Sequence, residues 1–297
     1  IYAYADEEGF RTNLCTRSAP LKSEGQSGIS PRTQNDLEFL ERKVGAVTPP
    51  KTEPYTIGII ETLHSDILGQ NRTLNIYLPQ GYKENDTAGY PVIYLLDGSA
   101  DEDFLHVVGL LQFSNFPWLN YMPECILVGI ANIDRKHDLT FPSSQAEYVK
   151  KYPTTGGSAA FIKFIDLELQ PFISEHFKTN GERMLIGQSL GGLLATEILY
   201  KKPEMFEHYF IVSPSLWYDN FSLFDVEPVF AQADFKKPLT VYVAVGAEGK
   251  LMKRGAKKLY KQVKRAQAVN SQYKYFKDED HASILHEALY RGFRNFR

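Results

Sequence analysis

Three residues of this 297-residue chain have the types and spacing needed for nucleophilic chemistry: a serine, a histidine and a carboxylate, each placed after an apolar segment. The serine is Ser189, at the centre of a Gly-x-Ser-x-Gly pattern that ends the apolar run 184–186 and precedes a helix-like pattern. A strand that turns sharply into a helix holds such a serine in a strained turn with its hydroxyl exposed. Side chains at Gly187 and Gly191 would collide with the neighbouring strand or helix. The pattern predicts a nucleophile at Ser189.

The base follows from chain order. A serine hydroxyl is a weak nucleophile at neutral pH, so it needs a base beside it and an acid that holds the base. With this kind of turn the order is serine, acid, histidine, each after a strand. Of seven histidines, only His281 and His286 follow both Ser189 and a later predicted strand. His281 falls in the loop after that strand and is the expected base, whereas His286 falls inside the final helix. The alternative for His281 is a loop histidine among carboxylates.

The acid is expected at Glu248, because this residue directly follows the predicted strand 239–245. A carboxylate there would fix the imidazole tautomer and stabilise the imidazolium during proton transfer. Three other carboxylates compete with it, namely Asp225, Asp278 and Asp280. A solvated turn glutamate, or a serine–histidine pair without an acid, is also compatible with the sequence.

An oxyanion hole needs two backbone N–H groups that point at the developing charge. Leu190, directly after the nucleophile, would supply one from the start of the helix. The second is expected from the loop after the predicted strand 92–96, at Ser99 or Gly98.

Two further loops follow predicted strands at the same end of the sheet. Arg135 could bind a substrate carboxylate or polar ring oxygen, or belong to a loop held by its own Arg–Asp pair. Trp217 and Tyr218 could stack on a sugar or aryl ring, or form the packed core of their loop.

Strands alternate with helices from residue 55 onward, which predicts an α/β fold with a mostly parallel, doubly wound sheet and helices on both faces. The expected strands are 57–68 and 73–78, an antiparallel pair, then 92–96, 125–130, the run before Ser189, 209–212, 239–245 and 272–276. The expected helices are 158–177, kinked near Pro171, then one after Ser189 to about 201, then 252–268 and 283–296.

Residues 1–50 differ in composition from the rest. They are rich in Ser, Gly and Pro between 18 and 31, with a short helix expected at 36–43 and no visible chemistry. We therefore expect a largely irregular N-terminal extension (1–50) and a catalytic domain (51–297).

Charge and composition exclude several function classes. A net charge of −3 with interspersed signs does not favour nucleic-acid binding, and no apolar run approaches the ~18 residues of a membrane span. HExxH, a Walker loop and a GxGxxG after a strand are all missing, so no metal or nucleotide cofactor is expected. The chain starts at Ile1 without a signal-peptide pattern, which suggests a processed or trimmed form and leaves the compartment open between cytoplasmic and exported. Nothing indicates an oligomeric state.

From about residue 55 to 296 the chain resembles the "Putative esterase" (esterase D-like) family of α/β hydrolases. The motifs that carry the resemblance are Val92-Ile93-Tyr94-Leu95-Leu96-Asp97-Gly98, the Asn132…Arg135…Asp138…Thr140 loop, Gly156-Gly157-Ser158-Ala159-Ala160-Phe161, Gly187-Gln188-Ser189-Leu190-Gly191-Gly192, Ser213-Pro214-Ser215-Leu216-Trp217 and Asp280-His281-Ala282-Ser283.

The family includes siderophore, feruloyl and acetyl-xylan esterases, S-formylglutathione hydrolases and mycolyltransferases, and the resemblance is closest to the enterobactin-type siderophore-esterase-like group. It implies Ser189 as nucleophile, His281 as base, Leu190 as one oxyanion donor and Ser99, in preference to Gly98, as the other. The acid varies within the family.

These observations together predict a serine esterase that hydrolyses a small-molecule ester through an acyl-enzyme. Siderophore, feruloyl and acetyl-sugar esters all fit. The alternatives are an acyltransferase or thioesterase on the same fold, and a non-catalytic binding module. Fold alone does not separate these activities.

Overall fold

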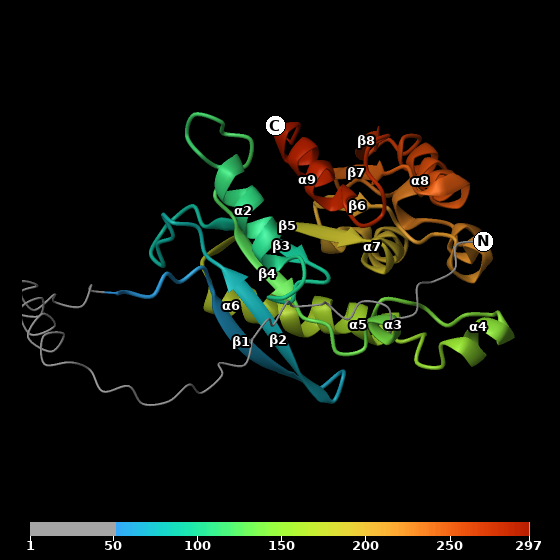
Figure 1. Ribbon diagram of the computed structural model, residues 1–297, viewed down its shortest axis with the longest axis horizontal. Coiled ribbons are helices and arrows are strands. Elements are labelled where there is room, and N and C mark those ends of the chain that lie inside the picture. Colours follow the sequence, from blue (N-terminus) through green and yellow to red (C-terminus); the bar gives the residue numbers. More distant parts are fainter. Residues whose placement is uncertain (1–51, 297) are drawn as a thin grey trace, which may run out of the picture. The chain divides into compact units, whose positions relative to one another are not determined.

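The computed structural model describes residues 52–296 (Figure 1). The expected N-terminal extension 1–50, with its short helix at 36–43, lies outside the described residues.

The described strands form one sheet in the order β1-β2-β4-β3-β5-β6-β7-β8. In chain order they are β1 (Ile59–Ser65), β2 (Gln70–Tyr77), β3 (Tyr90–Leu95), β4 (Ile126–Ile130), β5 (Thr179–Gln188), β6 (His208–Val212), β7 (Leu239–Val245) and β8 (Val269–Tyr275). β1 and β2 pair antiparallel, β2 joins β4 antiparallel, and every pair from β4 to β8 is parallel. The mostly parallel α/β sheet expected from the sequence is confirmed.

Helical segments follow most strands. They are α2 (Phe104–Ser114), α3 (Arg135–Asp138), α4 (Ala146–Lys151), α5 (Ser158–Phe164), the π-helix η1 (Ile165–Leu169), α6 (Gln170–His176), α7 (Leu190–Lys201), α8 (Gly249–Val263) and α9 (Ile284–Arg294), with 3-10 turns η2 (Pro203–Met205), η3 (Tyr218–Asp225) and η4 (Val229–Ala231). No helix in the span 52–296 combines the length and apolar character needed to cross a bilayer.

Helices cover both faces of the sheet because successive strand side chains point to opposite faces. In β3, Val92 and Tyr94 pack into the core beneath α5, α6, α7 and α8, whereas Ile93 and Leu95 pack beneath α2 and α9. All four side chains are at most 2% exposed. Such double burial explains why β3 reads as a continuous apolar run, as parallel strands do.

The helix expected at 158–177 is one helical run with an irregularity. α5 passes into the π-helix η1, and α6 begins one residue before Pro171. Proline has no N–H to donate and crowds the preceding turn, so the chain widens into a π-turn there.

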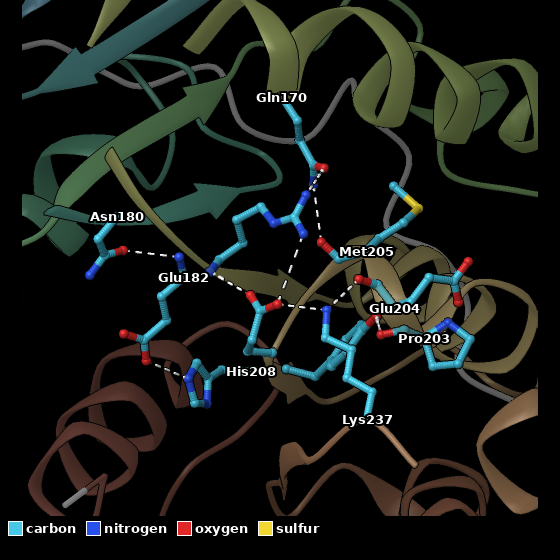
Figure 2. Close-up of polar contacts among 11 residues, drawn as sticks. Gln170, Asn180, Glu182, Pro203, Glu204, Met205, His208 and Lys237 are labelled. Carbon is cyan, nitrogen blue, oxygen red and sulfur yellow. Dashed lines mark hydrogen bonds and ion pairs between the residues drawn. The ribbon is translucent and has the colours of Figure 1, made fainter. Parts of the chain in front are cut away.

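A polar network fastens the amino-terminal ends of the central strands (Figure 2). Glu207 accepts a hydrogen bond from the backbone N–H of Arg183 (2.7 Å) and forms an ion pair with the ammonium of Lys237 (2.6 Å). The Arg183 guanidinium in turn donates to the side-chain oxygen of Gln170 on α6 (2.7 Å), and Gln170 donates to the carbonyl of Met205 (3.3 Å). This network fixes β5, β6, β7 and α6 at the end of the sheet opposite the loops that carry the candidate residues.

Those loops all leave the carboxyl ends of neighbouring parallel strands. β5 leads to Ser189, β6 to the turn 213–217, β7 to Glu248 and β8 to His281. Because the strands are parallel and adjacent, their carboxyl ends meet at one edge, where ligand sites of α/β sheets are built.

Candidate active site

Ser189 occupies the strained turn that its sequence pattern predicts. Its backbone lies at φ 58° and ψ −117°, outside the helix that begins at Leu190. A Cβ on Gly187 would approach the Gly191 carbonyl oxygen to 2.4 Å, and one on Gly192 would approach Pro214 Cα to 2.9 Å. Gly191 has slightly more room, with its nearest contact at 3.2 Å, so Gly187 and Gly192 are the positions that most need glycine.

His281 lies between Ser189 and Glu248. Its Nε2 atom is 3.0 Å from the Ser189 hydroxyl oxygen, and its Nδ1 atom is 2.5 Å from a Glu248 carboxylate oxygen. This order of serine, imidazole and carboxylate is that of a catalytic triad. The structure brings together the three residues that chain order selected.

The Glu248 side chain is buried and only 3% exposed, whereas the His281 side chain is 46% exposed. Burial alone would raise the pKa of this carboxyl, but hydrogen bonds from His281, the Ser213 hydroxyl and the Gly246 N–H outweigh burial and lower the pKa. Glu248 is therefore a carboxylate at neutral pH, which is the form that stabilises an imidazolium.

The competing acids do not take this position. Asp280 uses its carboxylate to accept the backbone N–H groups of Ala282 (2.9 Å) and Ser283 (3.1 Å). These hydrogen bonds shape the turn that presents His281 and lower the pKa of Asp280. Gln188 also holds this turn, because its side-chain amide donates to the His281 carbonyl (2.6 Å).

The two candidates for the second oxyanion donor, Gly98 and Ser99, differ in whether their backbone N–H is free to bind a substrate oxygen. The Gly98 N–H donates to the Ile130 carbonyl (3.1 Å), and a Cβ on Gly98 would meet Gly129 Cα at 2.3 Å. The Ser99 N–H makes only a long contact of 3.4 Å with the Glu102 carboxylate. As the first residue of α7, Leu190 has an N–H without an intrahelical acceptor. The geometry thus favours Leu190 and Ser99.

Arg135 forms a bidentate ion pair with an aspartate outside its own loop. Its Nε and Nη2 atoms donate to the two carboxylate oxygens of Asp97 at 2.6 and 2.8 Å. Asp97 also accepts from the Asn132 amide (2.7 Å) and is 7% exposed. The aspartate that pairs with Arg135 thus comes from the loop after β3 and not from the loop of Arg135 itself. Arg135 remains 35% exposed at the side chain and faces the cavity beside Ser189.

Tyr218 is a core residue, which corrects its expected role in substrate stacking. It is fully buried, its hydroxyl donates to the Phe141 carbonyl (2.8 Å), and its ring packs edge-on against Phe141 and Tyr148. Trp217 is partly buried against the same core and is not among the residues that line the cavity beside Ser189.

An open cavity of about 330 Å³ lies beside Ser189. Its lining is polar and comprises Asp97, Glu102, Asp103, Arg135, Gln188, Ser189 and Ala282. This volume is at the lower end of the range for small-molecule sites.

No role was predicted from the sequence for Gln188, Asp97 or the two serines of the turn after β6, Ser213 and Ser215. The Ser213 hydroxyl donates to Glu248, and the Ser215 hydroxyl lies 3.4 Å from that of Ser189. All four residues lie in the motifs that carry the family resemblance, and this position was the signal in the sequence that could have identified them. Their partners are distant in the chain, so only the fold identifies what each contacts.

A mostly parallel sheet with a serine at the sharp turn between β5 and α7 and a histidine facing it is the arrangement of the α/β-hydrolase fold. The family model described as "Putative esterase" matches residues 65–290, and the chain therefore belongs to this esterase family.

Named relatives agree with the class. The chain is 27% identical over 261 residues to the ferri-bacillibactin esterase BesA of Bacillus subtilis (strain 168), covering 81% of this chain and 90% of that protein. The crystal structure of the BES protein from Bacillus cereus is similar at a TM-score of 0.73 and 27% identity, covering 84% and 98% of the two chains. An IroE-like serine hydrolase from Shewanella oneidensis has a TM-score of 0.71 at 30% identity, covering 80% and 79%. The protein is a serine carboxylic-ester hydrolase.

Proposed function

We propose that Ser189, His281 and Glu248 are the catalytic triad of this hydrolase and that its substrate is a siderophore-type ester. The observation that carries the proposal is the position of His281, whose two ring nitrogens lie 3.0 Å from the Ser189 hydroxyl and 2.5 Å from Glu248.

In acylation, the Ser189 oxygen attacks the ester carbonyl carbon while its proton passes to Nε2 of His281. Glu248 stabilises the resulting imidazolium through Nδ1. The N–H groups of Leu190 and Ser99 bind the carbonyl oxygen as it becomes negative; loss of one such donor typically lowers the rate ~10²–10³-fold. The carbon–oxygen bond to the alcohol then breaks, and the alcohol oxygen takes the proton from His281.

Deacylation repeats these steps with water. His281 removes a proton from water, whose oxygen attacks the acyl carbon. The bond to the Ser189 oxygen breaks, and that oxygen takes the proton back from His281. The free acid leaves, and Ser189 is restored.

The siderophore assignment is supported by the similarity to BesA, a ferri-bacillibactin esterase, and by the polar lining of the cavity. The part of the Arg135 guanidinium that does not bind Asp97 is suited to a polar oxygen of the substrate. Acyl transfer to an acceptor other than water uses the same triad, so the acceptor must be tested directly.

The test is hydrolysis of p-nitrophenyl acetate, p-nitrophenyl butyrate and a siderophore ester by wild type, Ser189→Ala, His281→Ala and Glu248→Ala. We expect turnover to fall ~10³-fold or more in the first two variants, because triad members act as a unit. Wild-type protein that shows neither turnover nor an acylation burst would contradict the proposal. Turnover that needs an added alcohol or thiol would identify a transferase. Turnover of the p-nitrophenyl esters without any hydrolysis of the siderophore ester would reject the substrate assignment alone.

A further inference from the structure

The turn after β6 places two buried serine hydroxyls at opposite ends of the proposed triad. Ser213 and Ser215 are 0% and 3% exposed. The Ser213 hydroxyl donates to Oε1 of Glu248, and the Ser215 hydroxyl lies 3.4 Å from the Ser189 hydroxyl. One short segment therefore contacts both the acid and the nucleophile.

The backbone fixes Ser215 beside the nucleophile. Its N–H donates to the Ser189 carbonyl (2.9 Å), and its own carbonyl accepts the N–H of Tyr218 (3.0 Å). Across residues 52–296, the Ser215 hydroxyl forms no hydrogen bond with any group other than the Ser189 hydroxyl. Burial of a hydroxyl without a strong partner is unfavourable, and the contact within reach of this hydroxyl is the candidate nucleophile.

The Ser189 oxygen has lone pairs for a second contact. In the proposed mechanism its single proton is donated to Nε2 of His281, 3.0 Å away, and a hydroxyl oxygen accepts up to two hydrogen bonds. A separation of 3.4 Å is long for this bond, but catalytic hydrogen bonds are often long without substrate and shorten in the reacting complex.

Ser213 fixes the other end. Its backbone is at φ 42°, and its N–H donates to the Ala244 carbonyl (2.8 Å). Oε1 of Glu248 accepts from the Ser213 hydroxyl and from the Gly246 N–H (2.9 Å), which leaves Oε2 for His281. Both carboxylate oxygens are thus assigned, and the plane of the carboxylate is fixed relative to the imidazole.

We propose that Ser215 is a further catalytic residue, whose hydroxyl donates a hydrogen bond to the Ser189 oxygen as that oxygen leaves the acyl group, and that Ser213 is a positioning residue acting through Glu248. This inference rests on the proposed function. In deacylation the bond between the acyl carbon and the Ser189 oxygen breaks, its electron pair stays on that oxygen, and the proton comes from His281. Ser215 keeps its own proton throughout and stabilises the charge that develops before proton transfer is complete.

The two roles predict different defects. Loss of the Ser215 hydroxyl should slow deacylation more than acylation, because the Ser189 oxygen is the leaving group only in the second half-reaction. Loss of the Ser213 hydroxyl should slow both. It should also move the acid limb of the pH profile upward, because that hydroxyl helps to keep the Glu248 pKa low. His281 is the titratable side chain that faces this carboxylate from the β8–α9 loop.

The experiment compares Ser215→Ala and Ser213→Ala with Ser114→Ala in the full-length protein. Ser114 ends α2, is 0% exposed, and its hydroxyl has no partner within the described part of the chain, so this variant controls for loss of a buried hydroxyl. Stopped-flow traces with p-nitrophenyl acetate separate the burst, which reports acylation, from the steady state, which reports deacylation.

For Ser215→Ala we expect steady-state turnover to fall about 10-fold, as for loss of one hydrogen bond, with the burst rate within about 2-fold of wild type. For Ser213→Ala we expect a similar fall in both phases and an upward shift of the acid limb. Labelling of Ser189 by a fluorophosphonate in wild type shows that the nucleophile itself is correct.

Equal effects of Ser215→Ala and Ser114→Ala on both phases would overturn the role of Ser215. An unmoved acid limb in Ser213→Ala would overturn that of Ser213. Wild-type protein without a burst or labelling would instead reject the proposed function on which the inference rests.

Discussion

Gln188 and His281 are joined by a hydrogen bond from the glutamine side-chain amide to the histidine backbone carbonyl, at 2.6 Å. Gln188 ends β5 and precedes Ser189, the proposed nucleophile, whereas His281 lies in the loop after β8. The bond therefore ties the loop that carries the proposed base to the strand that leads to the proposed nucleophile. Because the His281 side chain is 46% exposed, packing around the ring is incomplete, and this tie contributes to its position.

Replacing Gln188 with Ala should lower kcat about 10-fold, since misplacement of a base by a fraction of an ångström weakens proton transfer. KM for p-nitrophenyl acetate should change much less. Gln170→Ala is the matched control, because Gln170 also donates its amide to a backbone carbonyl, at the opposite end of the sheet (Figure 2). It should lower the melting temperature and leave kcat unchanged. A kcat for Gln188→Ala equal to that of Gln170→Ala would show that the tie is not needed for catalysis.

Glu248→Gln should keep the shape of the acid and remove its charge. The Gln amide can present an N–H toward His281, which favours the wrong imidazole tautomer, so kcat should fall ~10²–10⁴-fold. Asp280→Asn is the control, because Asp280 accepts backbone N–H groups of the His281 loop. It should reduce kcat by less than about 10-fold. Steady-state hydrolysis of p-nitrophenyl butyrate measures both, and a loss in Glu248→Gln no larger than in Asp280→Asn would reduce the triad to a Ser189–His281 pair.

The sequence predicted the candidate triad because local rules apply to each member. Ser189 follows from the glycine pattern between a strand and a helix, and His281 and Glu248 follow from their places directly after apolar strands. Parallel neighbours carry such residues to one sheet edge without any further information. The same reasoning predicted the strands from β3 to β8, which differ from expectation only at their ends.

Other features depend on contacts that local patterns do not encode. Arg135 and Asp97 are far apart in the chain, so their pairing is visible only after β3 and β4 align. Tyr218 follows a strand as a ligand-stacking aromatic would, yet packing against Phe141 and Tyr148 buries it. α2 was not among the helices predicted from the sequence, although its buried residues Phe104, Val107, Val108 and Leu111 recur at helical spacing.

Arg135→Ala should affect both stability and substrate preference. It leaves the Asp97 carboxylate, 7% exposed, without its bidentate partner, and this should lower the free energy of unfolding by about 1–3 kcal/mol. If the guanidinium also binds substrate, KM for a siderophore ester should rise about 10-fold while KM for p-nitrophenyl acetate stays within about 2-fold. Urea unfolding and steady-state kinetics measure the two effects. An equal change of KM for both esters would reject a role of Arg135 in substrate binding and leave it only the structural role of its pair with Asp97.

Asp103 should make the protein less stable at neutral pH than a neutral residue would. Burial, together with the neighbouring Asp97 and Glu102 carboxylates, raises the pKa of Asp103 to about 6, although Arg135 opposes this. A raised pKa in the folded state means that the folded protein holds this proton more tightly than the unfolded chain, whose value is 3.8. The stability that protonated Asp103 contributes to the folded protein is therefore fully present below the unfolded pKa, and it is lost as pH rises through about 6. Asp103→Asn, which keeps a good residue at the start of α2, removes that loss.

At pH 8 we expect Asp103→Asn to be more stable than wild type by about 1–2 kcal/mol, after a discount for the part of the carboxylate that faces solvent. The difference should shrink as pH falls toward 4. Asp101→Asn, at an exposed position in the same loop, is the control and should stay within about 0.5 kcal/mol of wild type at every pH. Denaturant unfolding between pH 4 and 8 measures the trend. A gain in stability for Asp103→Asn that does not change with pH would mean that burial and the neighbouring carboxylates do not raise the pKa of Asp103. Only a group that titrates between pH 4 and 8 makes the stability difference change across this range.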